Sequence, residues 1–244
     1  MLKFFTILAL VFSLEAYAAG GEVHLPEQEW HFDGVFGTYD KAALQRGFQV
    51  YREVCSACHG MKRVRYRELA ALGYNEGQIK AVASEYTVMD GPNDEGEMFE
   101  RPATPADPFK SPFDNEQAAR YANNGANPLD LSLIAKARLG GADYVCALLT
   151  GYTGKEQDGK YYNKYFPGHW LSMAPPLSDG QVTYSNGESA TVAQAAKDVA
   201  EFLTWAAEPE LDKRKRMGWH VLLFLGALAI VMYLVKKRVW KDAK

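Results

Sequence analysis

Apolar residues recur at helical spacing in two parts of the chain. The first pattern starts behind Asp40, whose side chain is of the type that caps helix N-termini, and we expect a helix from there through Cys55. Its apolar face consists of Leu44, Phe48, Tyr51, Val54 and Cys55. The second pattern covers residues 191–207 and ends before Pro209, which cannot continue a helix. Its apolar stripe consists of Val192, Ala196, Val199, Phe202, Leu203 and Ala206.

The rest of the pattern favours short helices and long loops. Two short helices are expected at residues 131–138 and 143–149, separated by a pair of glycines. Four prolines favour an extended loop at residues 101–112, and the aromatic segment 161–168 is also expected to be a loop. The strand signal is weak apart from a short hairpin around residues 185–187. The expected fold class is therefore mainly α.

The N-terminus has the pattern of an export signal. An apolar run at residues 4–12 follows Lys3, and small residues stand at Ala16 and Ala18. A charged start, a short apolar core and a small-x-small site are typical of a secretory signal peptide, and the run is too short to span a bilayer. We expect residues 1–18 to be a cleaved signal peptide, with an uncleaved anchor as the alternative.

A second apolar stretch lies at residues 217–235. A helix of this length is about 28 Å long at about 1.5 Å per residue, close to the hydrocarbon thickness of a bilayer. Trp219 and Tyr233 lie near its ends, as interface residues do, and basic runs on both sides argue against a buried helix of a soluble core. We expect an exported domain at residues 19–212, a membrane anchor helix at 213–236 and a short cytoplasmic tail at 237–244.

The charge is distributed unevenly. The whole chain has a net charge of −3, but residues 20–212 contain 17 Lys and Arg against 28 Asp and Glu, a net charge of −11. An acidic exported domain repels nucleic acid and suits a basic protein partner. The segment 85–100 contains six acidic residues and no Lys or Arg. It is either an ordinary solvated loop or a docking surface that steers a cationic partner.

The most specific motif is CSACH at residues 55–59. The C-x-x-C-H spacing is the signature of c-type haem attachment: Cys55 and Cys58 each bind one vinyl group, and His59 ligates the iron from one face. A redox dithiol or half of a zinc site is the alternative. A zinc site would need further ligands, but the other cysteine, Cys146, stands alone and the remaining histidines are scattered. Haem iron indicates electron transfer.

The opposite face of such an iron needs a second ligand or stays open. Away from the motif and the membrane stretch, the methionines available are Met89, Met98 and Met173. Met173 precedes two prolines, which stiffen its loop and lower the entropy lost when a thioether binds. His169 is the rival ligand, and bis-histidine ligation would lower the reduction potential.

Segments across nearly the whole mature chain resemble the cytochrome c1 family, the haem subunit of the quinol–cytochrome c oxidoreductase complex. The markers are CSACH at 55–59, ARYANNGA at 119–126, PLDLS at 128–132, DYV at 143–145, LTGY at 149–152, YFPG at 165–168, MAPP at 173–176, AAKDV at 195–199, WAAEPE at 205–210 and KRMG at 215–218.

The resemblance implies a cytochrome c-like haem domain on one C-terminal membrane helix. It implies one haem c bound through Cys55 and Cys58, axial ligands His59 and Met173, and Arg120 near a haem propionate, where its fork would match a carboxylate. Its implied partners are cytochrome b and the Rieske iron–sulfur protein in a membrane complex, dimeric in the family, with a soluble or tethered cytochrome c as electron acceptor. We interpret Cys146 as a small buried apolar residue.

The secretory N-terminus indicates a bacterial member, on the periplasmic side of the inner membrane. The implied function is to pass electrons from the Rieske protein to a c-type cytochrome, as a redox subunit that is not an enzyme by itself. Two alternatives remain open from the residues. One is a tethered cytochrome that delivers electrons directly to a terminal oxidase, and the other is a haem peroxidase, which requires an open or labile sixth position.

Overall fold

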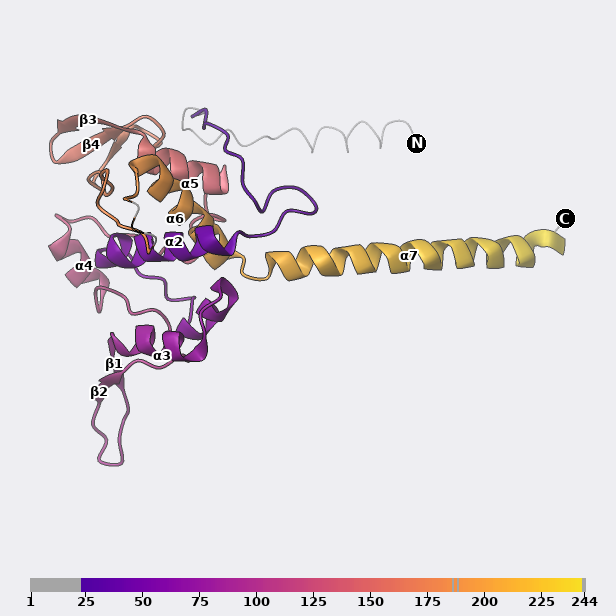
Figure 1. Cartoon of the computed structure of the whole chain (residues 1–244), viewed down its shortest axis with the longest axis horizontal. Coiled ribbons are helices and arrows are strands. Elements are labelled where there is room, and N and C mark those ends of the chain that lie inside the picture. Colours follow the sequence, from indigo (N-terminus) through magenta and orange to yellow (C-terminus); the bar gives the residue numbers. More distant parts are fainter. Residues whose placement is uncertain (1–22, 186, 188, 243–244) are drawn as a thin grey trace, which may run out of the picture.

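The computed structural model describes residues 23–185, 187 and 189–242. A mainly helical body occupies one end of the molecule, and a single long helix, α7, projects from it (Figure 1). The expected signal peptide at residues 1–18 lies outside the described residues.

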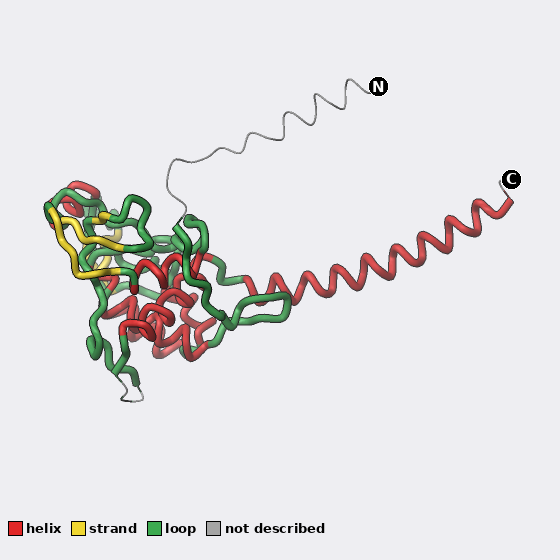
Figure 2. Tube along the Cα trace, turned by 90° about the horizontal axis from the view of Figure 1, so that it is seen from above, coloured by secondary structure: helices red, strands yellow, loops and turns green. Residues whose placement is uncertain are grey.

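The elements confirm a mainly α fold with long connections, and Figure 2 shows how much of the body is loop. The α-helices are α2 (Lys41–Glu53), α3 (Glu76–Ser84), α4 (Glu116–Ala122), α5 (Gly141–Thr150), α6 (Val192–Ala207) and α7 (Leu211–Val239). Short 3₁₀ helices are η2 (Cys55–Ala57), η3 (Tyr66–Leu72) and η4 (Trp240–Asp242). The strands are β1 (Thr87–Asp90), β2 (Phe99–Pro102), β3 (Tyr152–Gln157), β4 (Lys160–Asn163) and β5 (Trp170–Leu171).

Helix α2 begins where its capping residue predicts but ends earlier than expected. The Asp40 carboxylate accepts a hydrogen bond from the amide of Ala42 at 3.0 Å. The α-helix stops at Glu53, and the carbonyl of Cys55 then accepts from the amides of both Cys58 and His59. The prediction of a helix through Cys55 is therefore wrong at its C-terminal end, because the chain tightens there into the 3₁₀ turn η2.

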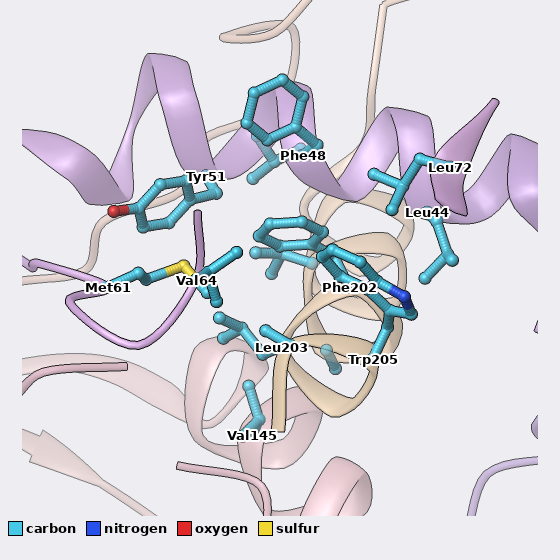
Figure 3. Close-up of a cluster of buried hydrophobic side chains, with 14 of the residues drawn as sticks. Leu44, Phe48, Tyr51, Met61, Val64, Leu72, Val145, Phe202, Leu203 and Trp205 are labelled. Atoms are coloured by element: carbon cyan, nitrogen blue, oxygen red, sulfur yellow. The ribbon is translucent and has the colours of Figure 1, made fainter. Parts of the chain in front are cut away.

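The core forms where α2 crosses α6. Gly47 makes the close approach possible: a Cβ at this position would lie 2.1 Å from the backbone oxygen of Asp198 and 2.6 Å from Cβ of Phe202. Around the crossing, the Phe48 and Phe202 rings lie 5.7 Å apart (Figure 3). Trp205 stacks on Phe202 at 5.7 Å and is almost fully buried. The predicted helix at 191–207 is confirmed, with Thr191 as its cap.

Two buried carboxylates of α6 have partners on the facing elements. Asp198 receives two hydrogen bonds from the Arg46 guanidinium, at 2.8 and 2.9 Å, and one from the Tyr184 hydroxyl at 2.8 Å. Glu201 accepts from the backbone amide of Asp40 at 3.2 Å. Because a buried charge without a partner is strongly destabilising, these contacts fix how α6 sits on α2.

The loops differ from the sequence pattern in two places and agree with it in a third. Residues 131–138 form successive turns instead of an α-helix: their backbone hydrogen bonds are mostly of the i to i+3 type, and the Leu131 amide and Ser132 hydroxyl bind the distant segment 60–63. The segment expected as a loop at 161–168 begins inside β4, the middle strand of the small sheet β3–β4–β5. Around residues 185–187, Thr183 and Ser189 form one antiparallel bridge, in agreement with a short hairpin.

The acidic segment is an antiparallel hairpin that extends from the body (Figure 1). Strand β1 pairs with β2 in the register Thr87 to Pro102. The proline-rich segment from 101 therefore starts as a strand, and the remainder runs as a loop in agreement with the prediction. Arg101 bridges Asp90 and Asp107, which anchors the base of the hairpin.

Helix α7 exposes its apolar side chains on all sides. In the part of the chain that the structure describes, it is the one helix long and apolar enough to cross a membrane, with a mean hydropathy of 2.1 over its best 18 residues and none of these buried. Its one buried residue is Leu211, at the junction with the body. A buried helix of a soluble core is therefore excluded.

Candidate functional site

The two cysteines of the CSACH motif lie in a tight turn that follows α2. The 3₁₀ helix η2 ends at Cys58, whose amide donates to the carbonyl of Cys55 at 3.1 Å, so one tight turn separates the two cysteines. Cys55 packs against the hydrophobic core, whereas Cys58 is exposed. Burial raises the pKa of the Cys55 thiol to about 12, so this sulfur stays uncharged in the folded protein.

The imidazole of His59 is oriented by a residue far along the chain. Its Nδ1 lies 2.7 Å from the backbone oxygen of Leu129. A carbonyl oxygen only accepts hydrogen bonds, so Nδ1 carries the proton and the lone pair is on Nε2. Burial lowers the pKa of His59, against the opposing hydrogen bond to Leu129, and favours the neutral ring. This is the state in which histidine binds a metal.

A cavity of about 580 Å³ opens beside Cys58, within the size range of cofactor sites. One wall follows the motif, and the other comes from the loop before α4, from α4 itself and from the segment after it. The lining residues are Cys58, Gly60, Lys62, Ser111, Pro112, Phe113, Asn115, Glu116, Gln117, Ala119, Asn127, Pro128, Leu129 and Asp130.

The two walls are joined at Gly60 and Asp130. The Leu131 amide donates to the carbonyl of Gly60 at 2.9 Å, and the Asp130 carboxylate accepts from the Lys62 amide at 2.9 Å. A Cβ at Gly60 would lie 2.7 Å from Oγ of Ser111, so the two walls also come close together at this point. The residues present fit a porphyrin: two cysteines one tight turn apart, an oriented imidazole after them, and an adjoining cavity.

Met173 lies in the loop after β5, and its backbone is held from another strand. The Tyr152 hydroxyl donates to the carbonyl of Met173 at 3.0 Å. Burial raises the pKa of Tyr152, which keeps this hydroxyl a donor. The Met173 side chain is half-buried, and the residue is not in the wall of the cavity. Its assignment as an iron ligand therefore stays a prediction.

The rival ligand His169 has a role in the small sheet. Its ring stacks on Tyr162, with ring centroids 5.3 Å apart, and its Nδ1 lies 3.2 Å from the Asn163 oxygen. Its backbone has a φ of 66°, which few residues other than glycine adopt. These contacts account for the residue without a metal.

Arg120 lies on α4, whose neighbouring Ala119 lines the cavity. Its guanidinium contacts the Gly125 oxygen at 3.3 Å and the Glu116 carboxylate at 3.9 Å, and half of the side chain is exposed. Arg120 itself is not in the cavity wall. Its expected place beside a propionate also stays a prediction.

The alternative chemistries of the cysteines find little support. Within the described residues, no group of three His, Cys, Asp or Glu side chains could hold a metal ion. Cys146 is buried in α5, and burial raises the pKa of its thiol. The expectation of a small buried apolar residue is confirmed, and neither buried thiol has the lowered pKa of a reactive cysteine.

Leu129, Gly60 and Tyr152 also belong to the site, and the sequence pattern does not predict a role for them. The signal for Leu129 was present, since it lies in the PLDLS marker at 128–132. Its contribution is a backbone oxygen, however, which every residue type has, so the residue type does not predict this role.

Comparisons with known proteins agree with this geometry. The model of the Cytochrome C1 family matches residues 30–243. The chain is 51% identical to cytochrome c1 of Rhodospirillum rubrum, over 94% of this chain and 92% of that protein. It is 46% identical to the "cytochrome b-c1 complex catalytic subunit, mitochondrial" of Candida albicans, over 93% of this chain and 81% of that protein. It is also 50% identical to part of a cytochrome b/c1 of Bradyrhizobium diazoefficiens, covering 37% of that longer protein. The chain therefore belongs to the cytochrome c1 family.

Proposed function

We propose that this chain is the haem-carrying redox subunit of a quinol–cytochrome c oxidoreductase complex. The family supports the class of protein, and the name of the Candida relative supports the complex. The observation that carries the proposal is the His59–Leu129 contact, which leaves Nε2 of a neutral imidazole able to bind iron next to a cavity that Cys58 and Leu129 line. The chain serves as an electron carrier, not as an enzyme by itself.

One haem c would be held by thioether bonds to Cys55 and Cys58 and by axial bonds from His59 and Met173. When bound, the haem supplies a one-electron iron couple. Leu129 holds the His59 ring in place, and Tyr152 holds the Met173 backbone. A thioether ligand raises the reduction potential relative to a second imidazole. The family resemblance alone supports Arg120 at a propionate, and its guanidinium would have to leave Glu116 and Gly125 to reach one.

The proposed direction of electron flow is from a Rieske iron–sulfur protein to a soluble or tethered c-type cytochrome. Cytochrome b is the proposed membrane partner, and the cytochrome b/c1 relative joins both names in one protein. Isolation of the native membrane complex tests this arrangement. Co-purification with cytochrome b and a Rieske protein is expected, and their absence would favour a tethered cytochrome that acts alone.

The proposed location is the bacterial inner membrane, with the haem domain on the periplasmic side and α7 as its anchor. Both flanks of α7 are basic, so charge alone does not orient the helix. Because haem is attached to c-type cytochromes after export, we propose that the body lies on the periplasmic side. The expected signal peptide at 1–18 is consistent with that orientation.

The ligand assignment is tested by the substitution Met173→Leu. The variant should keep its covalent haem but show a sharply lower reduction potential in an optical redox titration. Met98→Leu is the matched control, because Met98 is 56% exposed on the acidic hairpin and its loss should leave the potential unchanged. An unchanged titration for Met173→Leu would remove Met173 from the iron.

We also propose the acidic hairpin as a docking surface for a basic electron acceptor. Its tip presents Asp94, Glu95 and Glu97 to solvent. Neutralising these three residues to Asn, Gln and Gln should slow reduction of the acceptor and flatten the dependence of the rate on ionic strength. The control replaces Glu156 on β3 and Asp158 in the turn after it, which are also exposed. An unaltered salt dependence for the hairpin variant would place docking elsewhere.

A further inference from the structure

A short loop before α2 projects two large apolar side chains away from the body. We call residues 33–37 the Phe36 loop. Val35 is 69% exposed and Phe36 is 74% exposed. Two exposed apolar residues on a loop tip would ordinarily be unfavourable in water, at about 25 cal/mol per Å² of apolar surface. The backbone conformation around them holds both side chains in this exposed position.

The Phe36 loop is closed tightly at its base. A Cβ at Gly37 would lie only 1.9 Å from the backbone oxygen of Asp33, so the two ends of the loop approach as closely as a glycine permits. Gly34 has a φ of 69°, in the left-handed region, and a side chain there would meet no other atom within 4 Å. The chain therefore turns sharply at both glycines, and Val35 and Phe36 point outward between them.

The loop is fixed to the first turns of α7. The Lys215 ammonium donates to the backbone oxygens of Phe32 and Gly37, the latter at 2.9 Å. The Phe36 ring lies 5.7 Å from the ring of Trp219. Figures 1 and 2 both show the segment before α2 beside the start of α7. The contacts join positions 178 to 183 residues apart in the sequence.

The position of Trp219 sets the depth of Phe36 in a membrane. The apolar stretch of α7 starts at Met217, so Trp219 lies about 3 Å inside it at about 1.5 Å per residue. Lys215 lies about 3 Å on the other side of that boundary. If α7 spans the bilayer, a ring in contact with Trp219 is at the level where headgroups meet acyl chains, and aromatic residues favour that level.

We propose that the Phe36 loop inserts Val35 and Phe36 into the outer interface of the phospholipid bilayer, as a second membrane contact of the haem domain. The inference rests on the membrane insertion of α7 proposed above. Two contacts restrict the tilt of the body on the membrane, whereas one helix alone leaves the body free to pivot about the junction at residues 208–210. The interface between the loop and α7 thereby holds the haem domain at a set height.

Site-directed spin labelling tests the inference. The full-length haem protein, reconstituted in phosphatidylcholine–phosphatidylglycerol nanodiscs, carries Phe36→Cys with a nitroxide on a Cys146→Ala background. Collision with oxygen, which concentrates in lipid, is compared with collision with a water-soluble nickel chelate. The parent without an added cysteine reports any labelling at Cys55 or Cys58. Gly226→Cys marks the hydrocarbon, and Asp94→Cys marks water.

The Phe36 label should have high oxygen accessibility and lose accessibility to nickel relative to the Asp94 label. If the Gly226 label is exposed to lipid, α7 is in the membrane. A Phe36 label with the accessibility values of the Asp94 label would then overturn the inference. A label shielded from both reagents would mean that protein covers the loop, and would overturn it too. If Phe36→Cys folds poorly, Val35→Cys repeats the measurement. A Gly226 label exposed to water would overturn both the membrane insertion of α7 and the inference that rests on it.

Discussion

Helices α6 and α7 are separated by three residues, and both are rich in apolar side chains, yet they occupy opposite environments. Helix α6 is buried along most of its length, whereas α7 buries one residue, Leu211. The difference lies in the polar residues. Asp198 and Glu201 of α6 have partners on other elements, whereas residues 217–235 of α7 contain no Asp, Glu, Lys or Arg. A helix that packs on protein can contain charges because the partner satisfies them, and one that faces lipid cannot.

The largest expected effect is the difference in stability lost when one phenylalanine ring is removed from each helix. Phe202→Ala in α6 should lower the free energy of unfolding by about 3–5 kcal/mol, because Phe202 is fully buried against Phe48 and Trp205. Phe224→Ala in α7 is the control, since Phe224 is 66% exposed. Thermal unfolding of the detergent-solubilised haem protein gives both values. Equal losses would mean that α7 packs on the body.

A charge in α7 tests its environment directly. Leu225→Arg places the charge near the middle of the apolar stretch and should disfavour membrane insertion by about 2.5–3.5 kcal/mol. The measurement is the fraction of protein retained in membranes after alkaline carbonate extraction. Val239→Arg, at the end of α7 beside other basic residues, should be retained normally. Full retention of Leu225→Arg would show that α7 is not needed for anchoring.

Two glycines show how closely each helix approaches other parts of the protein. Gly47→Ala should destabilise the protein by about 1–3 kcal/mol, because α2 and α6 would have to move apart to admit the methyl group. Gly226→Ala in α7 meets no atom within 4 Å and should be neutral or slightly favourable for helix formation. Chemical denaturation of the solubilised protein compares the two. A neutral Gly47→Ala would contradict the close crossing.

The smallest expected effect concerns the buried carboxylate of α6. Burial raises the pKa of Glu201, against the hydrogen bonds from Asp40 and His31, so the folded protein holds a proton there more tightly than the unfolded chain does. The stability from that proton is complete below the unfolded pKa of about 4.3 and is lost as pH rises through the folded value.

Glu201→Gln should therefore raise the unfolding midpoint at pH 7 and leave it close to that of the parent at pH 4. The amide oxygen can still accept from the Asp40 amide, so the fold should be kept. Unfolding midpoints measured from pH 4 to pH 8 test the expectation. A difference between the two proteins that does not change with pH would assign the effect to packing and not to titration.

Much of the helical framework could be predicted because its determinants are local. The stripe of residues 192–206 places α6 within one residue of its observed start, and Asp40 marks the start of α2. The prediction failed where a distant segment binds the start of the expected helix, as at Leu131 and Ser132, and where a helix tightens, as at Cys55. The strands of the acidic hairpin were missed because their pairing joins residues 87–90 to 99–102, and neither strand has the alternating pattern alone.

The candidate site also has one part that the sequence predicts and another part that depends on distant contacts. The spacing of Cys55, Cys58 and His59 identified the haem motif without any structure. The tautomer of His59 depends on a carbonyl 70 residues away, and the cavity wall comes from the segment around α4. Such contacts are set by how distant segments pack, so no local pattern contains them.

The sequence by itself determined the main helices, the apolar stretch of α7 and the C-x-x-C-H motif from which haem binding is proposed, because periodicity and spacing act within a few turns of chain. The tertiary structure alone decided that Gly47 meets Asp198, that Leu129 orients His59 and that the Phe36 loop lies against Trp219. These are close approaches between segments far apart along the chain. Their free energy depends on complementary shape and on the pairing of buried polar groups, which arise only when the whole domain packs.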